Sequence, residues 1–294
     1  QGSLGVLITE CADYHQRQLD VEKGEIIRVV LITTPEAESH NRLLFVIHHL
    51  AIDGVSWRVL LEDLELLLNA AFGNASESTL GYKSSSYRQW YQALEQYGQS
   101  SNLLSQKAYW QKTIQNYEPL PVDKDHKGRV MAKDIAHHSI RLNAGQTRRL
   151  LQEVPRVYHS EINDILLCAL AGTLSDWSGQ SKVVIGLEGH GREAIAEGID
   201  TSRTVGWFTS LYPVLLETGS ALGPADQIKS VKEQLRHVPG HGLGYGVLKY
   251  INQEATLQGS DCWDIVFNYL GQFDNLVNES KWLKGANESA GHSI

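Results

Sequence analysis

The chain has 294 residues, of which 42% are hydrophobic and 20% are charged, and its 26 Lys and Arg residues against 34 Asp and Glu residues give a net charge of −8. These values are those of a globular protein of one large or two ordinary domains, and they exclude global disorder. The acidic balance disfavours a nucleic-acid partner, and the sequence has no signal peptide and no apolar run of the ~20 residues that span a membrane.

The three cysteines, Cys11, Cys168 and Cys262, are far apart in the sequence and form no CxxC pair. A disulfide framework has an even number of cysteines in a small secreted domain, and a zinc site has clustered ligands. The cysteines therefore favour a protein of the reducing cytoplasm. Cys168 falls in an apolar helical segment, where we expect it to be a small core residue.

The first part of the chain combines buried strands with a polar motif and a long helix. We expect strands at residues 26–33 and 42–47, the second being a continuous apolar run. That run leads into the sequence HHLAIDG at residues 48–54. A helix follows whose apolar residues recur every three or four positions, and Gly73 ends it.

The second part repeats this layout with a strand at residues 183–187 that leads into EGHGRE at residues 188–193. In α/β proteins, functional sites tend to form at such strand ends. Ser160 is expected to cap one further helix, and Pro224 to lie in the first turn of another. The remaining expected elements are strands at 137–142, 211–217 and 265–270 and helices at 87–99, 105–115, 143–153, 160–177 and 224–236.

Pro119 and Pro121, followed by a highly charged run, predict a linker at residues 123–129. It would divide the chain into a first part, residues 1–122, and a second part, residues 130–294. The fold class expected is therefore α/β with two lobes.

The adjacent histidines His48 and His49 are candidates for proton transfer near neutral pH, because histidine has the side chain whose ordinary pKa suits this role. Neighbouring residues at a strand end point to opposite faces, so one ring would face the core and the other an open site. Asp53 would fix an imidazole tautomer or pair with an arginine, and Gly54 permits the turn into the helix. A core histidine beside a helix cap and a metal site are the alternatives.

Glu188 closes a buried strand, where a carboxylate is costly unless it is paired or catalytic. The two glycines around His190 allow close approach of backbone or substrate. An internal salt bridge between Glu188 and Arg192 is the alternative to a catalytic role. His137 and His138 have no acidic neighbour in the sequence and are expected at the surface.

Five motifs, in order, resemble those of the epimerisation domains of nonribosomal peptide synthetases. HHLAIDG matches the HHxxxDG signature of the condensation superfamily, which includes chloramphenicol acetyltransferase-like folds. The full set is HHLAIDGVSWRVLLEDL at 48–64, EGHGRE at 188–193, RTVGWFTSLYPV at 203–214, GLGYGVLKY at 242–250 and FNYLGQFD at 267–274. Condensation domains are not expected to contain EGHGRE or FNYLGQF in this form.

The resemblance implies two chloramphenicol acetyltransferase-like lobes in a V-shaped arrangement with a central tunnel. It implies inversion, from L to D, of the α-carbon of an aminoacyl or peptidyl thioester on the phosphopantetheine arm of a carrier domain. No bound cofactor or metal is implied. The partners implied are an upstream peptidyl carrier domain and adenylation domain and a downstream condensation domain, in the bacterial cytoplasm.

Carried over to this sequence, the catalytic residues of the family are His49 and Glu188, on either side of the tunnel. Asp53 corresponds to the structural aspartate of the motif, and Asn268 and Tyr269 to the polar pair near the site. Our hypothesis is that Glu188 transfers the α-proton, whereas His49 stabilises the enolate oxygen or acts as the opposing acid.

Three alternatives remain open at this point. The first is a condensation domain in which His49 assists attack by an amine on a thioester. The second is an inactive carrier-docking module, and the third is a metal-dependent hydrolase that uses His48, His49 and Asp53. Since the HHxxxDG motif lies deeper in the first lobe of family members, we also expect the first lobe and the C-terminus to be truncated.

Overall fold

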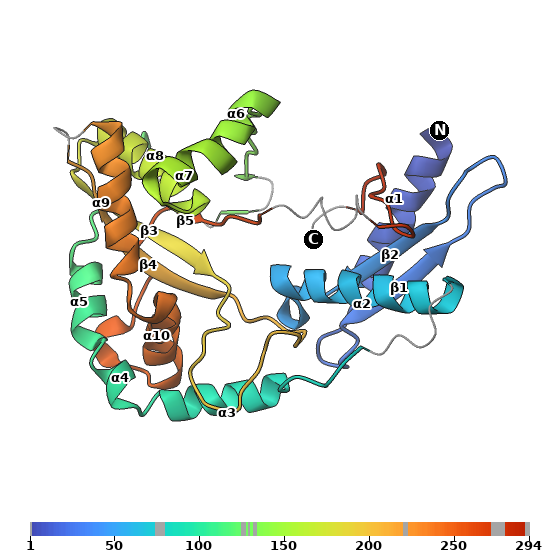
Figure 1. Ribbon diagram of the computed structural model, residues 1–294, viewed down its shortest axis with the longest axis horizontal. Coiled ribbons are helices and arrows are strands. Elements are labelled where there is room, and N and C mark those ends of the chain that lie inside the picture. Colours follow the sequence, from blue (N-terminus) through green and yellow to red (C-terminus); the bar gives the residue numbers. More distant parts are fainter. Residues whose placement is uncertain are drawn as a thin grey trace. The chain divides into compact units, whose positions relative to one another are not determined.

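The computed structural model describes residues 2–73, 80–124, 128, 130–131, 134–219, 223–271 and 280–291 (Figure 1). Gln1, residues 125–127 and 129 of the predicted linker, and residues 272–274 of the last motif lie outside this described part. None of the described helices is both long and apolar enough to cross a membrane.

The chain forms two compact units, each of them discontinuous in sequence. Unit 1 contains residues 1–93, 194–209 and 270–294, and unit 2 contains residues 94–193 and 210–269. This division differs from the predicted one, in which a linker at 123–129 separates residues 1–122 from 130–294. The predicted division assumed that each unit is continuous in sequence, whereas residues 194–209 and 270–294 belong to the first unit.

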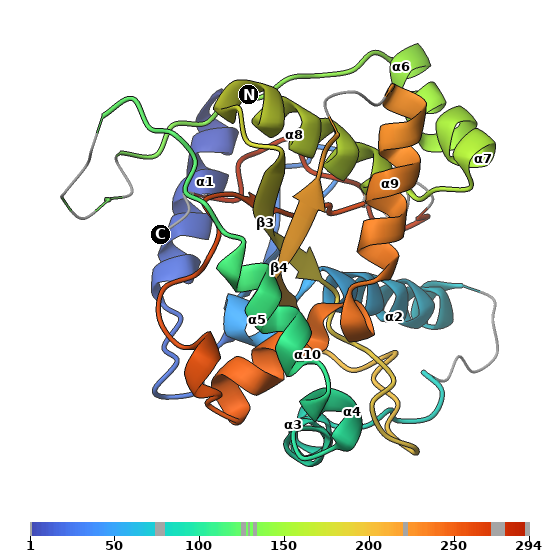
Figure 2. The same ribbon diagram turned by 90° about the vertical axis from the view of Figure 1, so that its left-hand side faces the viewer.

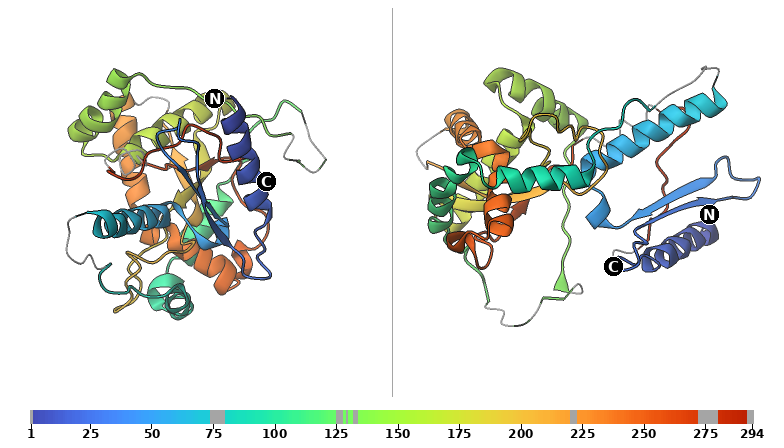
Figure 3. Two further views of the ribbon diagram at one scale, coloured as in Figure 1. Left: turned by 90° about the vertical axis from the view of Figure 1, so that its right-hand side faces the viewer. Right: turned by 90° about the horizontal axis from the view of Figure 1, so that it is seen from below.

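Unit 1 is built around an antiparallel hairpin of β1 (Ile27–Ile32) and β2 (Arg42–Ile47). Helix α1 (Gly2–Arg17) lies on one side of the hairpin and α2 (Gly54–Phe72) on the other (Figure 3). Phe45 of β2 makes an edge-to-face contact with Trp57 of α2. The helix α3 (Tyr87–Tyr97) begins in this unit and ends in unit 2.

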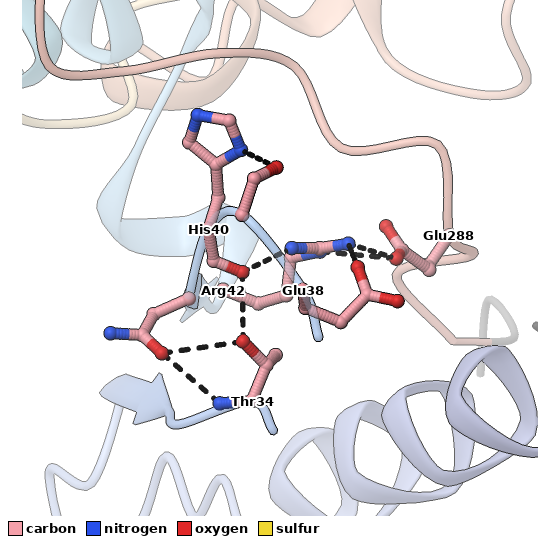
Figure 4. A network of polar contacts seen from close by, with 7 residues as sticks. Thr34, Glu38, His40, Arg42 and Glu288 are labelled. Carbon is pink, nitrogen blue, oxygen red and sulfur yellow. Dashed lines mark hydrogen bonds and ion pairs between the residues drawn. The ribbon is translucent and has the colours of Figure 1, made fainter. Parts of the chain in front are cut away.

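The C-terminal segment is held to unit 1 by an ion pair of Arg42, at the start of β2, with Glu288. The Arg42 guanidinium donates to Glu288 Oε1 from Nε at 3.0 Å and from Nη2 at 2.7 Å, and a second ion pair joins it to Glu38 (Figure 4). The hydrogen bond from Arg42 lowers the pKa of Glu288 below its usual range. Arg42 and Glu288 are among the residues that line a groove of about 490 Å³.

Unit 2 contains a three-stranded sheet of β3 (Lys182–Gly189), β4 (Ser210–Glu217) and β5 (Val266–Phe267), in the order β4-β3-β5, and Figure 2 shows β3 beside β4. Strand β3 pairs antiparallel with β4 and parallel with β5. Helices α8 and α9 pack against each other and against this sheet. The elements are α4 (Ser101–Leu104), α5 (Lys107–Gln115), α6 (Ala144–Arg148), η3 (Arg149–Glu153), α7 (Val154–Tyr158), α8 (Ile162–Ser178), β3 (Lys182–Gly189), β4 (Ser210–Glu217), α9 (Pro224–Arg236), η4 (Pro239–Gly242), α10 (Leu243–Gly246), η5 (Val247–Ile251), η6 (Ala255–Leu257) and β5 (Val266–Phe267).

A cluster of 18 buried, mostly apolar side chains in the described part of the chain lies entirely in unit 2. It includes Trp110, Ile185, Leu216 and Leu248, each of which is completely inaccessible to solvent. Cys168 belongs to the same cluster, which confirms its prediction as a core residue, and burial raises the pKa of its thiol. All three cysteines are unpaired thiols.

Most of the predicted elements are found, with corrected ends. The strand at 42–47 and the helix at 224–236 have the predicted bounds, and the long helix α2 ends before Gly73 as expected. The predicted helix 105–115 starts at Lys107, after the separate short helix α4. The predicted helix 143–153 is capped by Asn143 but changes to π-helical geometry after Arg148.

Three sequence-based expectations for unit 2 are wrong. Residues 137–142 form no strand, because these six residues are all exposed and pair with no other strand in the described part of the chain. The strand predicted at 265–270 is limited to Val266–Phe267, where it pairs with β3. Ser160 is not the cap of α8. Glu161 is, and the Glu161 and Asp164 side chains form a reciprocal capping box.

Candidate active site

Strand β2 ends at Ile47, and the two histidines that follow it have different environments. His48 is half-buried, and its Nδ1 accepts a hydrogen bond of 3.1 Å from the backbone N–H of Leu50. This bond caps η1 (His49–Ala51), a single 3₁₀ turn. Because Nδ1 is the acceptor, the proton of the neutral His48 ring is on Nε2. His48 therefore shapes the turn that presents its neighbour.

The His49 side chain is exposed, and its ring lies edge-to-face against Trp207, with 5.8 Å between the ring centroids and an interplanar angle of 66°. Both residues belong to unit 1. The sequence predicts that one histidine ring faces the core and the other an open site; His49 is the more exposed of the two histidines, and His48 is half-buried and not part of the core.

Asp53 is buried at 3% exposure and holds two backbone segments of unit 1 together. Its Oδ1 accepts from the N–H of Ser56 at 2.7 Å, which caps α2, and its Oδ2 accepts from the N–H of Phe208 at 3.1 Å. Gly54 is the first residue of α2 and is exposed. Through these contacts Asp53 joins the start of α2 to the backbone at Phe208.

In unit 2, β3 is buried from Val183 to Leu187, and Glu188 follows as a half-buried residue. The neighbouring strand β5 runs parallel to β3, with Leu187 opposite Phe267. This register brings the next residue, Asn268, beside Glu188, and its side-chain amide donates a hydrogen bond to Glu188 Oε2. Tyr269 follows as a partly buried residue.

Gly189 and Gly191 have different structural reasons to be glycine. A Cβ at Gly189 would lie 2.9 Å from the hydroxyl of Ser210, on the paired strand β4. Gly191 has a positive φ of 66°, which a residue with a side chain rarely adopts. The glycines of the EGHGRE motif therefore allow close strand packing and a tight turn.

The rest of the EGHGRE motif folds back on itself. His190 Nδ1 accepts a hydrogen bond of 3.0 Å from the backbone N–H of Arg192, and its Nε2 lies 3.3 Å from a carboxylate oxygen of Glu193. Burial, together with the nearby Glu193 carboxylate, raises the pKa of Tyr212. This compact turn leaves Glu188 at the strand end, where Asn268 is its hydrogen-bond donor.

The predicted site residues thus form two groups. His48, His49, Asp53 and Gly54 lie together in unit 1, and the members of the group in unit 2 are Glu188, Arg192, Asn268 and Tyr269. In the described part of the chain, no group of three or more His, Cys, Asp or Glu side chains is arranged to hold a metal ion.

Ser56, Trp207 and Phe208 contribute to the first group but were not among the predicted residues. Ser56 Oγ donates to the carbonyl of Gly206 at 2.9 Å and accepts from its N–H at 3.1 Å. All three lie inside HHLAIDGVSWRVLLEDL or RTVGWFTSLYPV. The two motifs therefore included these residues. A pattern of residue types does not show, however, that hydrogen bonds to backbone groups join the two segments.

Comparison with known proteins places this arrangement in a family. A family model described as "Condensation domain" matches residues 6–290, which is most of the chain. The chain belongs to the condensation domain family. The two groups of site residues are therefore parts of a condensation-type α/β fold, as the sequence analysis predicts.

The curated relatives of this condensation-family chain are peptide synthetases. It is 40% identical to a linear gramicidin synthase of Brevibacillus parabrevis over 292 residues and 39% identical to bacitracin synthase 3 of Bacillus licheniformis over 282 residues. These alignments cover 98% and 95% of the chain but 4% of each relative. The chain is thus similar to a small part of very long proteins.

Two solved structures illustrate the range of similarity. The epimerization domain from the third module of tyrocidine synthetase B is 37% identical, with a TM-score of 0.86, and the match covers 98% of this chain and 64% of that domain. The first condensation domain of the calcium-dependent antibiotic synthetase is 18% identical, with a TM-score of 0.63, over 87% of this chain and 59% of that one. The second match supports the fold alone.

Proposed function

We propose that the chain is part of an epimerisation domain, which interconverts the L and D forms of an aminoacyl or peptidyl thioester. The observation that carries this proposal is the contrast between its 37% identity to an epimerization domain and its 18% identity to a condensation domain of the same fold. The HHxxxDG signature cannot separate the two activities, because it is common to the whole superfamily.

Glu188 is the group that we assign to transfer of the α-proton. A thioester makes its α-proton more acidic than that of an amide, so a positioned carboxylate is an adequate base. The side-chain amide of Asn268 donates to one carboxylate oxygen, Oε2. Since a carboxylate oxygen has two lone pairs and Oε1 is a separate acceptor, this contact orients the group and leaves Oε1 for the proton.

His49 is the second group of the proposed reaction. Inversion requires removal of a proton from one face of the α-carbon and delivery of a proton to the other, so two groups are the simplest solution. The exposed imidazole of His49 either stabilises the enolate oxygen or acts as the opposing acid. Asp53 acts in this scheme through the fold of unit 1, since its hydrogen bonds to Ser56 and Phe208 hold backbone segments.

The substrate in this proposal arrives on the phosphopantetheine arm of an upstream peptidyl carrier domain, after loading by an adenylation domain. A downstream condensation domain then takes the D form. The similarity to gramicidin and bacitracin synthases supports this setting. The chemistry assigned to Glu188 and His49 is acid–base chemistry that needs no resident cofactor.

The test follows solvent deuterium at the α-carbon of a carrier-bound aminoacyl thioester incubated with the complete domain. The proposal predicts rapid exchange and a mixture of L and D products, without peptide-bond formation when a second loaded carrier is added. Peptide-bond formation without exchange would instead establish a condensation domain. Neither reaction, in a folded domain that binds the carrier, would establish an inactive docking module.

A further inference from the structure

The loop that carries Trp207 is fastened to unit 1 at several points. Phe208 N–H donates to Asp53, Gly206 exchanges two hydrogen bonds with Ser56, and Thr204 Oγ1 donates to the carbonyl of Ser85 at 2.5 Å. All of these residues belong to unit 1, although residues 194–209 follow β3 of unit 2 in the sequence. These hydrogen bonds therefore fix the position of the loop within unit 1.

A further contact fixes the backbone of Trp207 itself. Its carbonyl accepts a hydrogen bond of 2.7 Å from the hydroxyl of Tyr87. The preceding Gly206 is buried, and a Cβ there would lie 2.5 Å from the ring of Tyr87. None of these anchors uses the indole of Trp207, so the loop can keep its place when that side chain is changed.

Trp207 is 41% exposed as a residue, although several hydrogen bonds hold its backbone and that of its two neighbours. Its ring contact is with the imidazole of His49. In the described part of the chain, no hydrogen bond or ion pair fixes the His49 imidazole. An exposed histidine without such a partner samples several rotamers, and an aromatic ring at this distance favours one of them.

We propose that Trp207 is a positioning residue that holds the His49 imidazole in the orientation needed for reaction. The proposal rests on the proposed function for its kinetic consequence, but not for the contact itself. Besides their contacts at the start of α2, Asp53 and Ser56 would then hold in place the loop that contains Trp207, through their hydrogen bonds to Phe208 and Gly206. The HHxxxDG motif would thus provide the imidazole and also fasten the loop that orients it.

The test compares Trp207→Ala and Trp207→Phe with Trp177→Ala, which removes an exposed indole of α8 in unit 2. The chain has 12 histidines, so His49 is identified in a histidine-labelled sample by the signal that His49→Gln removes. Trp207→Ala should shift the ring signals of His49, because the ring current of the indole is lost. Trp177→Ala should leave these signals in place.

In the complete domain, Trp207→Ala should lower kcat for α-proton exchange roughly three- to tenfold, the size expected for one edge-to-face aromatic contact, with KM changed less than twofold. Trp207→Phe should recover most of this loss, and the urea midpoint should stay close to that of Trp177→Ala. An unchanged His49 signal, or a kcat equal to that of Trp177→Ala, would overturn the proposal. If the unmutated domain shows no exchange, the proposed function fails, and the His49 signals alone decide whether Trp207 orients the ring.

Discussion

The two units bury their apolar residues very differently. In unit 2, β3 is buried over most of its length and β4 over half of it, and their side chains join one cluster with residues of α5, α8, α9 and α10. In unit 1, alternate residues of β1 are exposed, with Val29 at 54% and Leu31 at 64%. A two-stranded hairpin is marginally stable in isolation. Unit 2 therefore has the larger share of the buried core, whereas unit 1 depends more on hydrogen bonds and ion pairs.

Several of these hydrogen bonds and ion pairs involve residues next to the candidate site of unit 1. Asp53 and Ser56 bind the backbone of the 203–209 loop, and Arg203 of the same loop forms ion pairs with Glu62 and Asp63 on α2. In unit 2, Glu188 instead follows directly from a buried strand. Hydrogen bonds thus hold the backbone around the candidate residues of unit 1, whereas strand pairing holds the backbone around Glu188 in unit 2.

The largest expected effect comes from removing core volume in unit 2. Leu216 of β4 is completely buried, whereas Leu31 of β1 is 64% exposed. Leu216→Ala should lower the free energy of unfolding by roughly 2–5 kcal/mol, and Leu31→Ala by about 0.5 kcal/mol or less. Urea denaturation of both variants measures this difference. Equal losses would show that the core is shared evenly between the units.

A smaller effect is expected from two glycines with the same backbone requirement. Gly242 of unit 2 has a φ of 84°, and a Cβ there would lie 2.1 Å from the ring of Tyr212. Gly24 of unit 1 has a φ of 74° but no atom within 4 Å of such a Cβ. Both alanine variants force a side chain into the left-handed region, but only Gly242→Ala also brings a Cβ against the ring of Tyr212. We therefore expect Gly242→Ala to lower the free energy of unfolding by about 1–3 kcal/mol more than Gly24→Ala. Thermal denaturation at one pH gives this comparison, and a matching loss for Gly24→Ala would contradict tight packing around Tyr212.

The smallest effect concerns the ion pair between Arg42 and Glu288 in unit 1. Arg42 lowers the folded-state pKa of Glu288 below the ordinary value of about 4.3. The stabilisation from this ion pair is therefore fully present above the ordinary pKa of glutamate. It is lost as the pH falls through the lower pKa that Glu288 has in the folded protein. The indole signal of Trp282, on the same segment, should report this release in acid. Glu288→Gln should abolish the transition, whereas Glu36→Gln, at an exposed position, should preserve it.

Much of the fold follows from local patterns in the sequence. The apolar run at 42–47 and the periodic helix ending before Gly73 were predictable, because burial of one face requires that spacing. The strand expected at 137–142 was not found, because no strand in the described part of the chain pairs with these exposed residues. Helix α1 was not predicted at all, although Ile8 and Ala12, one turn apart, are both buried.

The site was predictable only in part. His49 and Glu188 stand out by residue type at the ends of strands, and the structure places His49 in the turn after β2 and Glu188 near the end of β3, whereas Asp53 caps helix α2. The roles of Trp207 and Ser56 depend on contacts between residues about 150 positions apart, since Ser56 bonds to the backbone of Gly206. No periodicity or composition encodes such a pairing, so it emerges only from the structure.

The proposed mechanism assigns transfer of the α-proton to Glu188, and to His49 either stabilisation of the enolate oxygen or the role of the opposing acid. Its most direct test is solvent deuterium incorporation into a carrier-bound aminoacyl thioester by the complete domain, with Glu188→Gln compared with Glu217→Gln and His49→Ala with His138→Ala. Glu217 and His138 are exposed and far from both groups in the sequence. We predict that Glu188→Gln and His49→Ala each lower the exchange rate at least about 100-fold, the size typical of lost acid–base catalysis, while both controls retain it. Full exchange in both Glu188→Gln and His49→Ala would contradict the account.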